Sequence, residues 1–177
     1  LIENDVFPSD KYAVESQLRH HDYDEKEGLI LWKPRKNEKL NRYEDLETIL
    51  EEQGNEIALI MIGAINYYTG QYFDLKRITE LAHKYGCKVG FDCAHAAGNV
   101  PLNLHASGAD FAVWCTYKYL NSGPGSLAGC FVHERHAHKK TLNRFTGWWS
   151  HNKETRFKMR DLFDVISGAE GWQLSNP

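Results

Sequence analysis

The sequence lacks the features of a membrane protein and of a nucleic-acid-binding protein. Its longest apolar run, IALIMIGAI at residues 57–65, is far shorter than the ~20 residues that a membrane-spanning helix needs. The net charge is only −3, and the lysine and arginine residues are scattered. The opening residues also lack the basic and apolar pattern of a signal peptide. The sequence therefore predicts a cytoplasmic protein without a membrane or nucleic-acid partner.

Cysteine is scarce and is not arranged in pairs. The four cysteines lie singly in apolar segments, and no C-x-x-C pair is present among Cys87, Cys93, Cys115 and Cys130. Disulfide frameworks and zinc sites need cysteines grouped at characteristic spacings. We therefore expect buried free thiols, with neither a disulfide framework nor a bound metal.

The composition is that of an ordinary globular domain. The chain has 177 residues, of which 42% are hydrophobic and 25% are charged, which is enough apolar material for one core. It begins at Leu1 without a methionine and stops at Asn176 and Pro177 without an evident terminal element. These ends predict that the chain is a piece of a longer protein.

Apolar runs predict the strands. They lie at residues 57–63, 87–92, 110–115 and 127–133, with a shorter strand at 28–32. Continuous apolar runs of this kind are typical of strands that are buried on both faces.

Apolar residues at helical spacing predict helices between these strands. One helix covers residues 43–53, and another covers 74–86 with Asp74 as N-cap and Gly86 as C-cap. A further helix starts near Ser9 or Asp10, and a helical turn lies near 102–108. The segment 136–163 shows no clear pattern. The alternation of strands and helices predicts an α/β fold with a mainly parallel sheet and helices on both faces.

Two charged residues follow neighbouring strands of this predicted sheet. Asp92 ends the strand at 87–92, and Lys118 comes shortly after the strand at 110–115. Because ligands gather at the carboxyl ends of parallel strands, we expect both side chains to open onto one crevice. An acid and a lysine in this arrangement are what an enzyme that uses pyridoxal phosphate (PLP) needs, because the lysine binds the cofactor and the acid holds its ring nitrogen protonated.

The pattern alone leaves a simpler interpretation open. A single aspartate after a strand is usually a helix cap or a turn former, and a single lysine is usually solvated. Lys118, however, stands between Tyr117 and Tyr119 and is followed by a glycine-rich turn at 121–125. This setting weakens the simpler interpretation without excluding it.

Specific motifs then identify a family. The chain contains F-D-x-A-H at 91–95, W-C-x-Y-K-Y-L-N at 114–121 and G-W-W-x-H at 147–151. With these motifs it closely resembles the kynureninases, PLP-dependent hydrolases of the aspartate aminotransferase fold, from FPSD at 7–10 to LSNP at 174–177. The resemblance implies that residues 1–177 are a fragment of the PLP-binding large domain, without the preceding segment and without the C-terminal small domain.

The resemblance also implies roles for individual residues. Lys118 would bind PLP and shuttle the proton of the substrate Cα, Asp92 would pair with the ring nitrogen, and Tyr117 would bind the phosphate and act as a general acid. The other residues implied at the cofactor site are Phe7, which would stack on the ring, Ser9, Asp10, His95 and Trp148, together with Asn176, which would meet the aromatic end of the substrate.

The implied reaction is hydrolytic cleavage of the Cβ–Cγ bond of kynurenine, or of 3-hydroxykynurenine, in tryptophan catabolism and NAD biosynthesis. The products would be anthranilate, or its 3-hydroxy form, and L-alanine. The family is homodimeric, and its phosphate-binding loop and its substrate-binding arginine lie in segments that this chain lacks. Gly63 also stands where some relatives carry a hydroxyl residue. We therefore expect the chain alone to be inactive or nearly so.

Two alternatives remain at this point. An aspartate and a lysine at this spacing also occur in other PLP enzymes, such as aminotransferases and cysteine desulfurases. A non-enzymatic alternative comes from HERHAH, because His133, His136 and His138 could bind a transition metal as a histidine-rich module. A solvated basic helix start explains the same residues.

Overall fold

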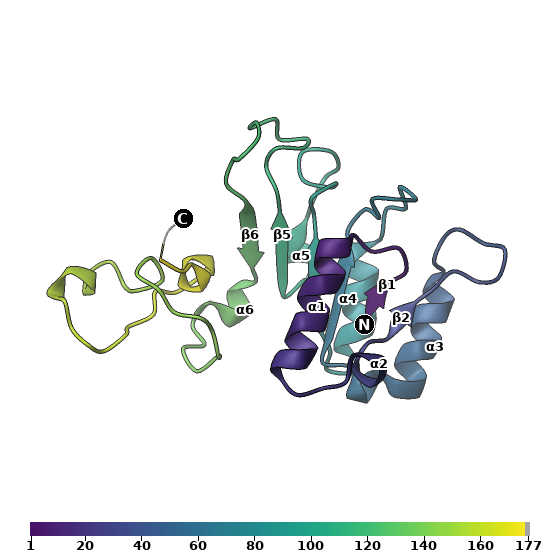
Figure 1. The fold of residues 1–177 in the computed structure, drawn as a ribbon, viewed down its shortest axis with the longest axis horizontal. Helices are drawn as coiled ribbons and strands as arrows, with labels where there is room; N and C mark the ends of the chain where they lie inside the picture. The colour runs from purple at the N-terminus through teal and green to yellow at the C-terminus, as the bar shows by residue number, and fades with distance from the viewer. Residues whose placement is uncertain (176–177) are drawn as a thin grey trace. The chain divides into compact units, whose positions relative to one another are not determined.

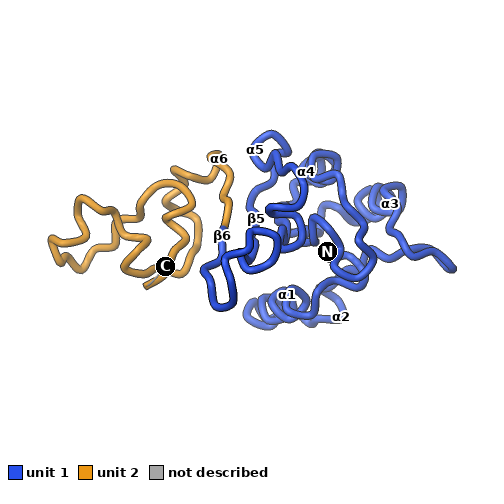
Figure 2. Tube along the Cα trace, turned by 90° about the horizontal axis from the view of Figure 1, so that it is seen from above, with its two compact units in different colours: residues 1–129 blue, residues 130–177 orange. Residues whose placement is uncertain are grey.

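The chain divides into two compact units in the computed structural model, which describes residues 1–175. The first unit covers residues 1–129 and the second starts at Cys130 (Figure 2). The composition predicts one core, whereas the structure separates the sequence that follows the last apolar strand. The reason lies in that sequence, because residues 136–163 are basic and aromatic without the apolar periodicity that would extend a core.

A parallel sheet forms the centre of the first unit. It contains β3 (Leu59–Gly63), β4 (Lys88–Asp92) and β5 (Phe111–Trp114), with β3 pairing β4 and β4 pairing β5 in parallel. The predicted strands are confirmed, although each is shorter than its apolar run. A fourth predicted strand is β6 (Gly129–Val132), which begins at the last residue of the first unit.

Helices cover both faces of this sheet, as the alternation of elements predicts. On one side lie α1 (Pro8–His20) and α2 (Glu25–Gly28), and on the other lie α3 (Tyr43–Gln53), α4 (Leu75–His83) and α5 (Leu104–Ser107) (Figures 1 and 2). The α/β class and the covering of both faces are therefore confirmed. Within residues 1–175, no helix has the length and apolar content that a membrane span requires.

Helix α4 shows how local signals set the ends of an element. The side chain of Asp74 accepts a hydrogen bond of 3.0 Å from the backbone N–H of Arg77, which confirms it as the N-cap. The helix ends at His83, three residues before the predicted end. Gly86 has a φ of +81°, so the last predicted residues form a left-handed turn that leads into β4.

A two-residue strand that the sequence does not predict lies beside β3. This strand, β1 (Ile2–Glu3), pairs in parallel with β2 (Leu31–Trp32), which lies within the strand predicted at 28–32. The backbone N–H of Met61 donates to the carbonyl of Leu1 at 2.9 Å, which joins β1 to β3. Strand β1 therefore brings Glu3 next to the carboxyl end of β3.

The core is built from the apolar runs that predict the strands. Strand residues such as Ile60, Ile62 and Phe91 are fully buried, and Leu46 and Ile78 from α3 and α4 are buried with them. Removing this apolar surface from water is the main force that stabilises the sheet. The strand ends that carry polar residues are held by this core.

The second unit is organised around a buried arginine. It contains β6, α6 (Glu134–Ala137) and two short 3₁₀ helices, η2 (Arg156–Lys158) and η3 (Ala169–Trp172). The guanidinium of Arg156 donates to the carbonyls of Trp149 and His151 at 2.9 and 3.0 Å and lies 4.8 Å from the centre of the Trp149 ring. Polar contacts of this kind leave no apolar pattern, so the sequence does not reveal them.

All four cysteines are free thiols, as predicted. Cys87 and Cys93 are buried, but Cys130 is exposed, which corrects the expectation that all four are buried. Cys130 lies on the exposed side of β6, which is only half-buried along its length. Burial raises the pKa of the Cys93 thiol to about 12, so this thiol stays protonated and unreactive.

The pairing of β4 with β5 can be tested at Gly90. Gly90 lies opposite Phe111, and a Cβ at this position would overlap the Phe111 ring. We predict that Gly90→Ala lowers the free energy of unfolding by about 1–3 kcal/mol, measured by urea denaturation, because the ring must move out of a packed position.

A double variant supplies the control. Adding Phe111→Leu to Gly90→Ala shortens the side chain that the new methyl group meets. The double variant should therefore lose less unfolding free energy than the sum of the losses in the two single variants. Strict additivity of the two substitutions would contradict the proposed clash.

Candidate functional site

A cavity lies at the carboxyl ends of β3 and β4, within the first unit. It is partly open to solvent, and its lining combines carboxyl groups, one ammonium group, one imidazole and two aromatic rings. The lining residues are Glu3, Phe7, Asp10, Gly63, Ile65, Tyr67, Asp92, His95 and Lys118. Asp92 and Lys118 thus open onto one cavity, which is the arrangement that the predicted strand order requires.

Asp92 is held rigidly at the end of β4. It lies opposite Gly63 of β3, and its backbone carbonyl accepts a hydrogen bond of 2.7 Å from the N–H of Ala64. Its side-chain Oδ1 accepts a second bond of 2.7 Å from the N–H of Ala94. The sheet and the turn after β4 together fix the position of this carboxylate.

Lys118 reaches the cavity from the loop after β5. Its Nζ atom lies 2.9 Å from Nε2 of His95 and 5.7 Å from the centre of the Phe7 ring. Burial and the nearby charge of Lys118 lower the pKa of His95. The neutral imidazole that results can accept a hydrogen bond from the ammonium group, which orients the lysine within the cavity.

Three carboxyl groups share this cavity with the single ammonium group of Lys118. Burial raises the pKa of Asp10 to about 7, and the charge of Asp92 and a hydrogen bond with the Asp92 side chain add to this effect. Burial also raises the pKa of Glu3 to about 7, against the opposing effect of its hydrogen bond from the Gly63 N–H. The cluster therefore retains protons at neutral pH, because like charges at close range cannot all ionise.

Aromatic rings form another wall of the cavity. Phe7 is the N-cap residue of α1 and is followed by Pro8 in the first turn, which fixes the direction of the chain at this point. The Phe7 and Tyr67 rings meet edge to face with centroids 5.4 Å apart. A flat surface of this kind suits an aromatic ligand.

The structure brings together five of the residues that the sequence singles out, namely Phe7, Asp10, Asp92, His95 and Lys118. Ser9 is exposed on α1 and does not line the cavity. Tyr117 is also exposed and away from the cavity lining, and a hydrogen bond with the Cys115 side chain raises the pKa of its phenol. Both residues lie in a bend that follows β5, so adjacency to Lys118 does not bring Tyr117 into the cavity lining.

The two remaining predicted residues lie elsewhere in the chain. Trp148 belongs to the second unit, where its ring packs edge to face on Phe157 at 5.6 Å. Asn176 lies outside the described residues.

Sequence reasoning missed Glu3, Ile65 and Tyr67. The signal that could have found Glu3 is a charged residue within the apolar start LIENDVF, directly ahead of FPSD. Gly63 contributes no side chain to the cavity, as expected, but its lack of a Cβ makes room for Glu3. A Cβ at Gly63 would lie only 3.2 Å from Oε1 of Glu3, so glycine lets the carboxyl group approach the backbone of β3.

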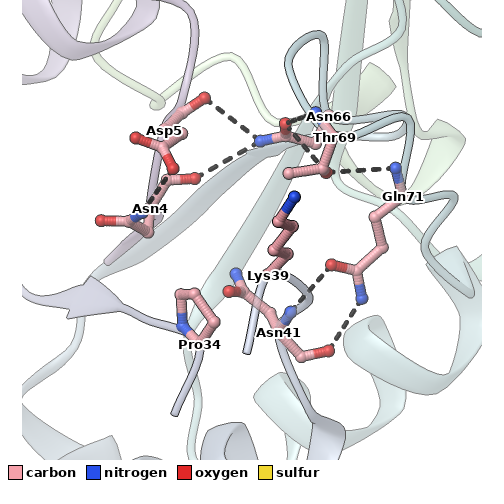
Figure 3. Close-up of a pocket in the computed structure, with 8 residues that line it drawn as sticks. All are labelled: Asn4, Asp5, Pro34, Lys39, Asn41, Asn66, Thr69 and Gln71. Atoms are coloured by element: carbon pink, nitrogen blue, oxygen red, sulfur yellow. Dashed lines mark hydrogen bonds between the residues drawn. The ribbon is translucent and has the colours of Figure 1, made fainter. Parts of the chain in front are cut away.

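A second, shallow cavity lies at the residues that follow Glu3 in the chain, Asn4 and Asp5, and is lined mostly by polar groups (Figure 3). Its centre is Asn66, whose side-chain amide donates to the carbonyls of Asn4 and Asp5 and whose Oδ1 accepts from the backbone N–H and hydroxyl of Thr69. Gln71 exchanges two hydrogen bonds with the backbone of Asn41. These bonds tie the end of β1 to the loop that carries Tyr67, so the network supports the first cavity.

No metal site accompanies these cavities in the described part of the chain. Among residues 1–175, no group of three or more histidine, cysteine, aspartate or glutamate side chains is placed to hold a metal ion. His133 in HERHAH instead caps α6, where its Nδ1 accepts a bond of 3.1 Å from the N–H of Arg135. The structure therefore offers no support for a histidine-rich metal-binding module.

Comparison with known proteins places the chain among relatives of known activity. The family model for Aminotransferase class-V matches residues 18–136. The chain is 59% identical over 177 residues to a kynureninase of Myxococcus xanthus (strain DK1622), which covers 100% of this chain and 42% of the relative. It is 49% identical over 177 residues to a kynureninase of Mus musculus, covering 100% of this chain and 38% of the relative. The chain thus spans less than half the length of these curated relatives.

A solved structure shows the same fold. A variant of C-DES with glycine covalently linked to its PLP cofactor matches with a TM-score of 0.74 and 15% identity, covering 99% of this chain and 44% of that chain. At this identity the match supports the fold and nothing beyond it. The fold and the resemblance to kynureninases that the motifs predicted are both confirmed.

The carboxyl cluster makes the stability of the protein depend on pH. The carboxyl of Glu3 has a pKa of 4.5 in its ordinary state and about 7 in the folded protein. Between these values the folded state holds a proton that the unfolded chain has lost, so stability falls as the pH rises from about 4.5 to 7 and then levels off.

We predict that Glu3→Gln removes this contribution because the amide stays neutral at every pH. The free energy of unfolding of the variant, minus that of the unsubstituted protein, should rise by about 3 kcal/mol from pH 4.5 to pH 8, measured by urea denaturation. Glu80→Gln is the matched control, since Glu80 is exposed on α4 and its loss should leave the pH dependence unchanged. Parallel pH curves for the unsubstituted protein and Glu3→Gln would contradict the role of Glu3.

Proposed function

Because the chain belongs to the aminotransferase class-V family, we propose that it forms the central part of the cofactor-binding large domain of a kynureninase. The reaction is PLP-dependent hydrolysis of the Cβ–Cγ bond of L-kynurenine, or of its 3-hydroxy form, to anthranilate, or 3-hydroxyanthranilate, and L-alanine. The observation that carries the proposal is the cavity in which Asp92 and Lys118 meet. The identities of 59% and 49% to kynureninases over the whole chain support this reaction.

The residues of the cavity fit PLP by their chemistry. Lys118 offers an amine for the aldehyde of PLP, Asp92 offers a fixed carboxylate for a protonated ring nitrogen, and Phe7 and His95 offer flat surfaces for the ring. When bound, PLP supplies a ring that accepts electrons from the substrate Cα. Asp10, beside Asp92, completes the acidic side of the cavity.

The chain's own residues have the proton-handling groups that this reaction needs. Lys118 takes the proton from the substrate Cα, and His95 orients it through the contact of 2.9 Å between Nζ and Nε2. Asp92 would favour a protonated ring nitrogen through its negative charge, and the N–H groups of Ala94 and Ala64 hold its carboxylate and its strand in place. Tyr117, with its raised pKa, stays protonated and can serve as a proton donor or phosphate ligand when the surrounding chain brings it to the site.

Activity requires more than this chain in our proposal. The curated relatives are more than twice as long, and the resemblance assigns the phosphate-binding loop and the arginine for the substrate carboxylate to segments that this chain does not span. Ser9, Trp148 and Asn176 would complete the site in a cytoplasmic homodimer that acts in tryptophan catabolism and NAD biosynthesis. The isolated chain would then be inactive or nearly so.

Other PLP enzymes remain the alternative to exclude. Aminotransferases and cysteine desulfurases use an aspartate and a lysine in the same way, and the reaction of this protein has to be separated from theirs. The identities of 59% and 49% to kynureninases favour C–C bond hydrolysis, whereas Asp92 and Lys118 are common to all three kinds of enzyme and do not separate them.

Cofactor binding can be tested on Lys118. We predict that PLP added to the protein, followed by borohydride reduction, modifies the peptide that contains Lys118, because its amine is the one that faces the cavity. Mass spectrometry of the digested protein identifies the peptide. Lys118→Ala should abolish the modification, whereas Lys84→Ala, at an exposed position after α4, should not. Equal labelling of Lys118→Ala would refute the assignment.

The reaction can be tested by its products in the complete protein. We predict anthranilate and alanine from kynurenine, measured by fluorescence and amino-acid analysis. Asp92→Asn should lower kcat roughly 10- to 100-fold, because a charge-assisted hydrogen bond to the ring nitrogen is lost. Formation of a keto acid or a persulfide in place of anthranilate would overturn the proposed reaction.

A further inference from the structure

Glu3 is buried beneath the cavity without a full set of partners. Its side chain is only 1% exposed, although it belongs to a two-residue strand and is a charged residue type. Its Oε1 accepts a hydrogen bond of 3.0 Å from the backbone N–H of Gly63. Its Oε2 is buried and makes no hydrogen bond of normal geometry among residues 1–175, although the Asn66 side chain is close enough to favour the ionised form. A buried polar atom without a partner is costly, so such an atom on a cavity wall indicates contact with whatever fills the cavity.

The surroundings of Glu3 explain why its carboxyl group keeps its proton to a higher pH than an ordinary glutamate does. Asp92 of β4 and Asp10 of α1 face the same cavity and disfavour a third negative charge. Lys118 supplies the opposing positive charge, and the neutral His95 adds none. Burial raises the pKa of Glu3 to about 7, in agreement with this balance of charges.

Glu3 is also linked to Asp92 through the backbone. The N–H of Gly63 that Glu3 binds belongs to the residue paired with Asp92 across β3 and β4. The next N–H, that of Ala64, donates to the carbonyl of Asp92. A change at Glu3 therefore acts on the strand end that fixes Asp92.

We propose that Glu3 is a positioning residue of the cofactor cavity, which holds β3 against Asp92 through Gly63 and releases its proton when a cationic aromatic ring fills the cavity. In this step the O–H bond of the Glu3 carboxyl breaks, and the proton passes to solvent. The carboxylate that forms stabilises the positive charge of the ring beside Asp92. The inference rests on the proposed function, since it takes PLP and its analogues as the occupants.

Proton release links binding to pH. If binding releases a proton from Glu3, then the affinity for a cationic ring must rise as the pH rises through the range in which Glu3 ionises. A variant without an ionisable group at this position loses that part of the pH dependence. The ratio of the two affinities removes the titration of the ligand itself, which is the same for both proteins.

The experiment uses pyridoxamine phosphate, which carries the PLP ring but cannot bond covalently to Lys118. Its Kd is measured by fluorescence titration between pH 5.5 and 8 in the complete protein, in Glu3→Gln, in Glu3→Ala and in the control Glu80→Gln. The affinity of the unsubstituted protein should rise about tenfold relative to Glu3→Gln over this range. At pH 5.5, Glu3→Gln should match the unsubstituted protein within about twofold, whereas Glu3→Ala should bind more weakly because Gly63 loses its acceptor.

A second measurement needs no variant. Carbon-13 NMR of the labelled Glu3 carboxyl should show a titration midpoint near neutral pH in the ligand-free protein. Saturating pyridoxamine phosphate should lower this midpoint by about one pH unit or more.

The outcomes separate the two proposals. A complete protein that binds no pyridoxamine phosphate overturns the proposed function and this inference with it. Binding with a constant affinity ratio between the unsubstituted protein and Glu3→Gln, or with an unchanged Glu3 midpoint, overturns the inference alone. Equal losses in Glu3→Gln and Glu3→Ala at pH 5.5 would also overturn it, because a neutral hydrogen-bonding group at this position would then not suffice.

Discussion

The parallel pairing of β3 with β4, which sets Gly63 opposite Asp92, is the constraint on which the cavity depends. Parallel strands end at one edge of their sheet, so the residues that follow them gather there. The pairing places Asp92 at this edge, β5 delivers the loop with Lys118 to the same edge, and the turn after β4 supplies His95. The buried apolar residues of the strands hold these ends in place without touching the cavity chemistry themselves.

Charge balance is the second feature that defines the site. The carboxyl groups of Glu3, Asp10 and Asp92 outnumber the one ammonium group of Lys118, and His95 is kept neutral by burial and by that ammonium group. Glu3 and Asp10 therefore hold their protons up to about pH 7, because burial and the neighbouring carboxyl groups raise their pKa values. Arranging these groups costs folding free energy, because buried acids that share protons are less stable than an apolar core. Such a cost at one end of the sheet is typical of a functional site.

The division of the chain limits what this structure alone can assemble. The cavity lies entirely within the first unit, whereas Trp148 belongs to the second, and the curated relatives are more than twice as long. Trp148 and the cavity are therefore described separately, each within its own unit. Within the first unit, Lys118 and Asp92 line the cavity, whereas Ser9 and Tyr117 are exposed and do not line it.

The sequence by itself determined the α/β class, the strands of the first unit and the opening of Asp92 and Lys118 onto one crevice, because apolar runs, helix caps and strand ends are local signals. Its family motifs also identified the relatives. Only the tertiary structure decided that Glu3 belongs to the cavity, that Tyr117 is exposed and does not line it, and that the second unit centres on Arg156. A two-residue strand has too few residues to show a period, and a polar contact depends on which distant backbone group lies opposite. The short strand and the polar contacts depend on packing in three dimensions, and no local sequence pattern predicts them.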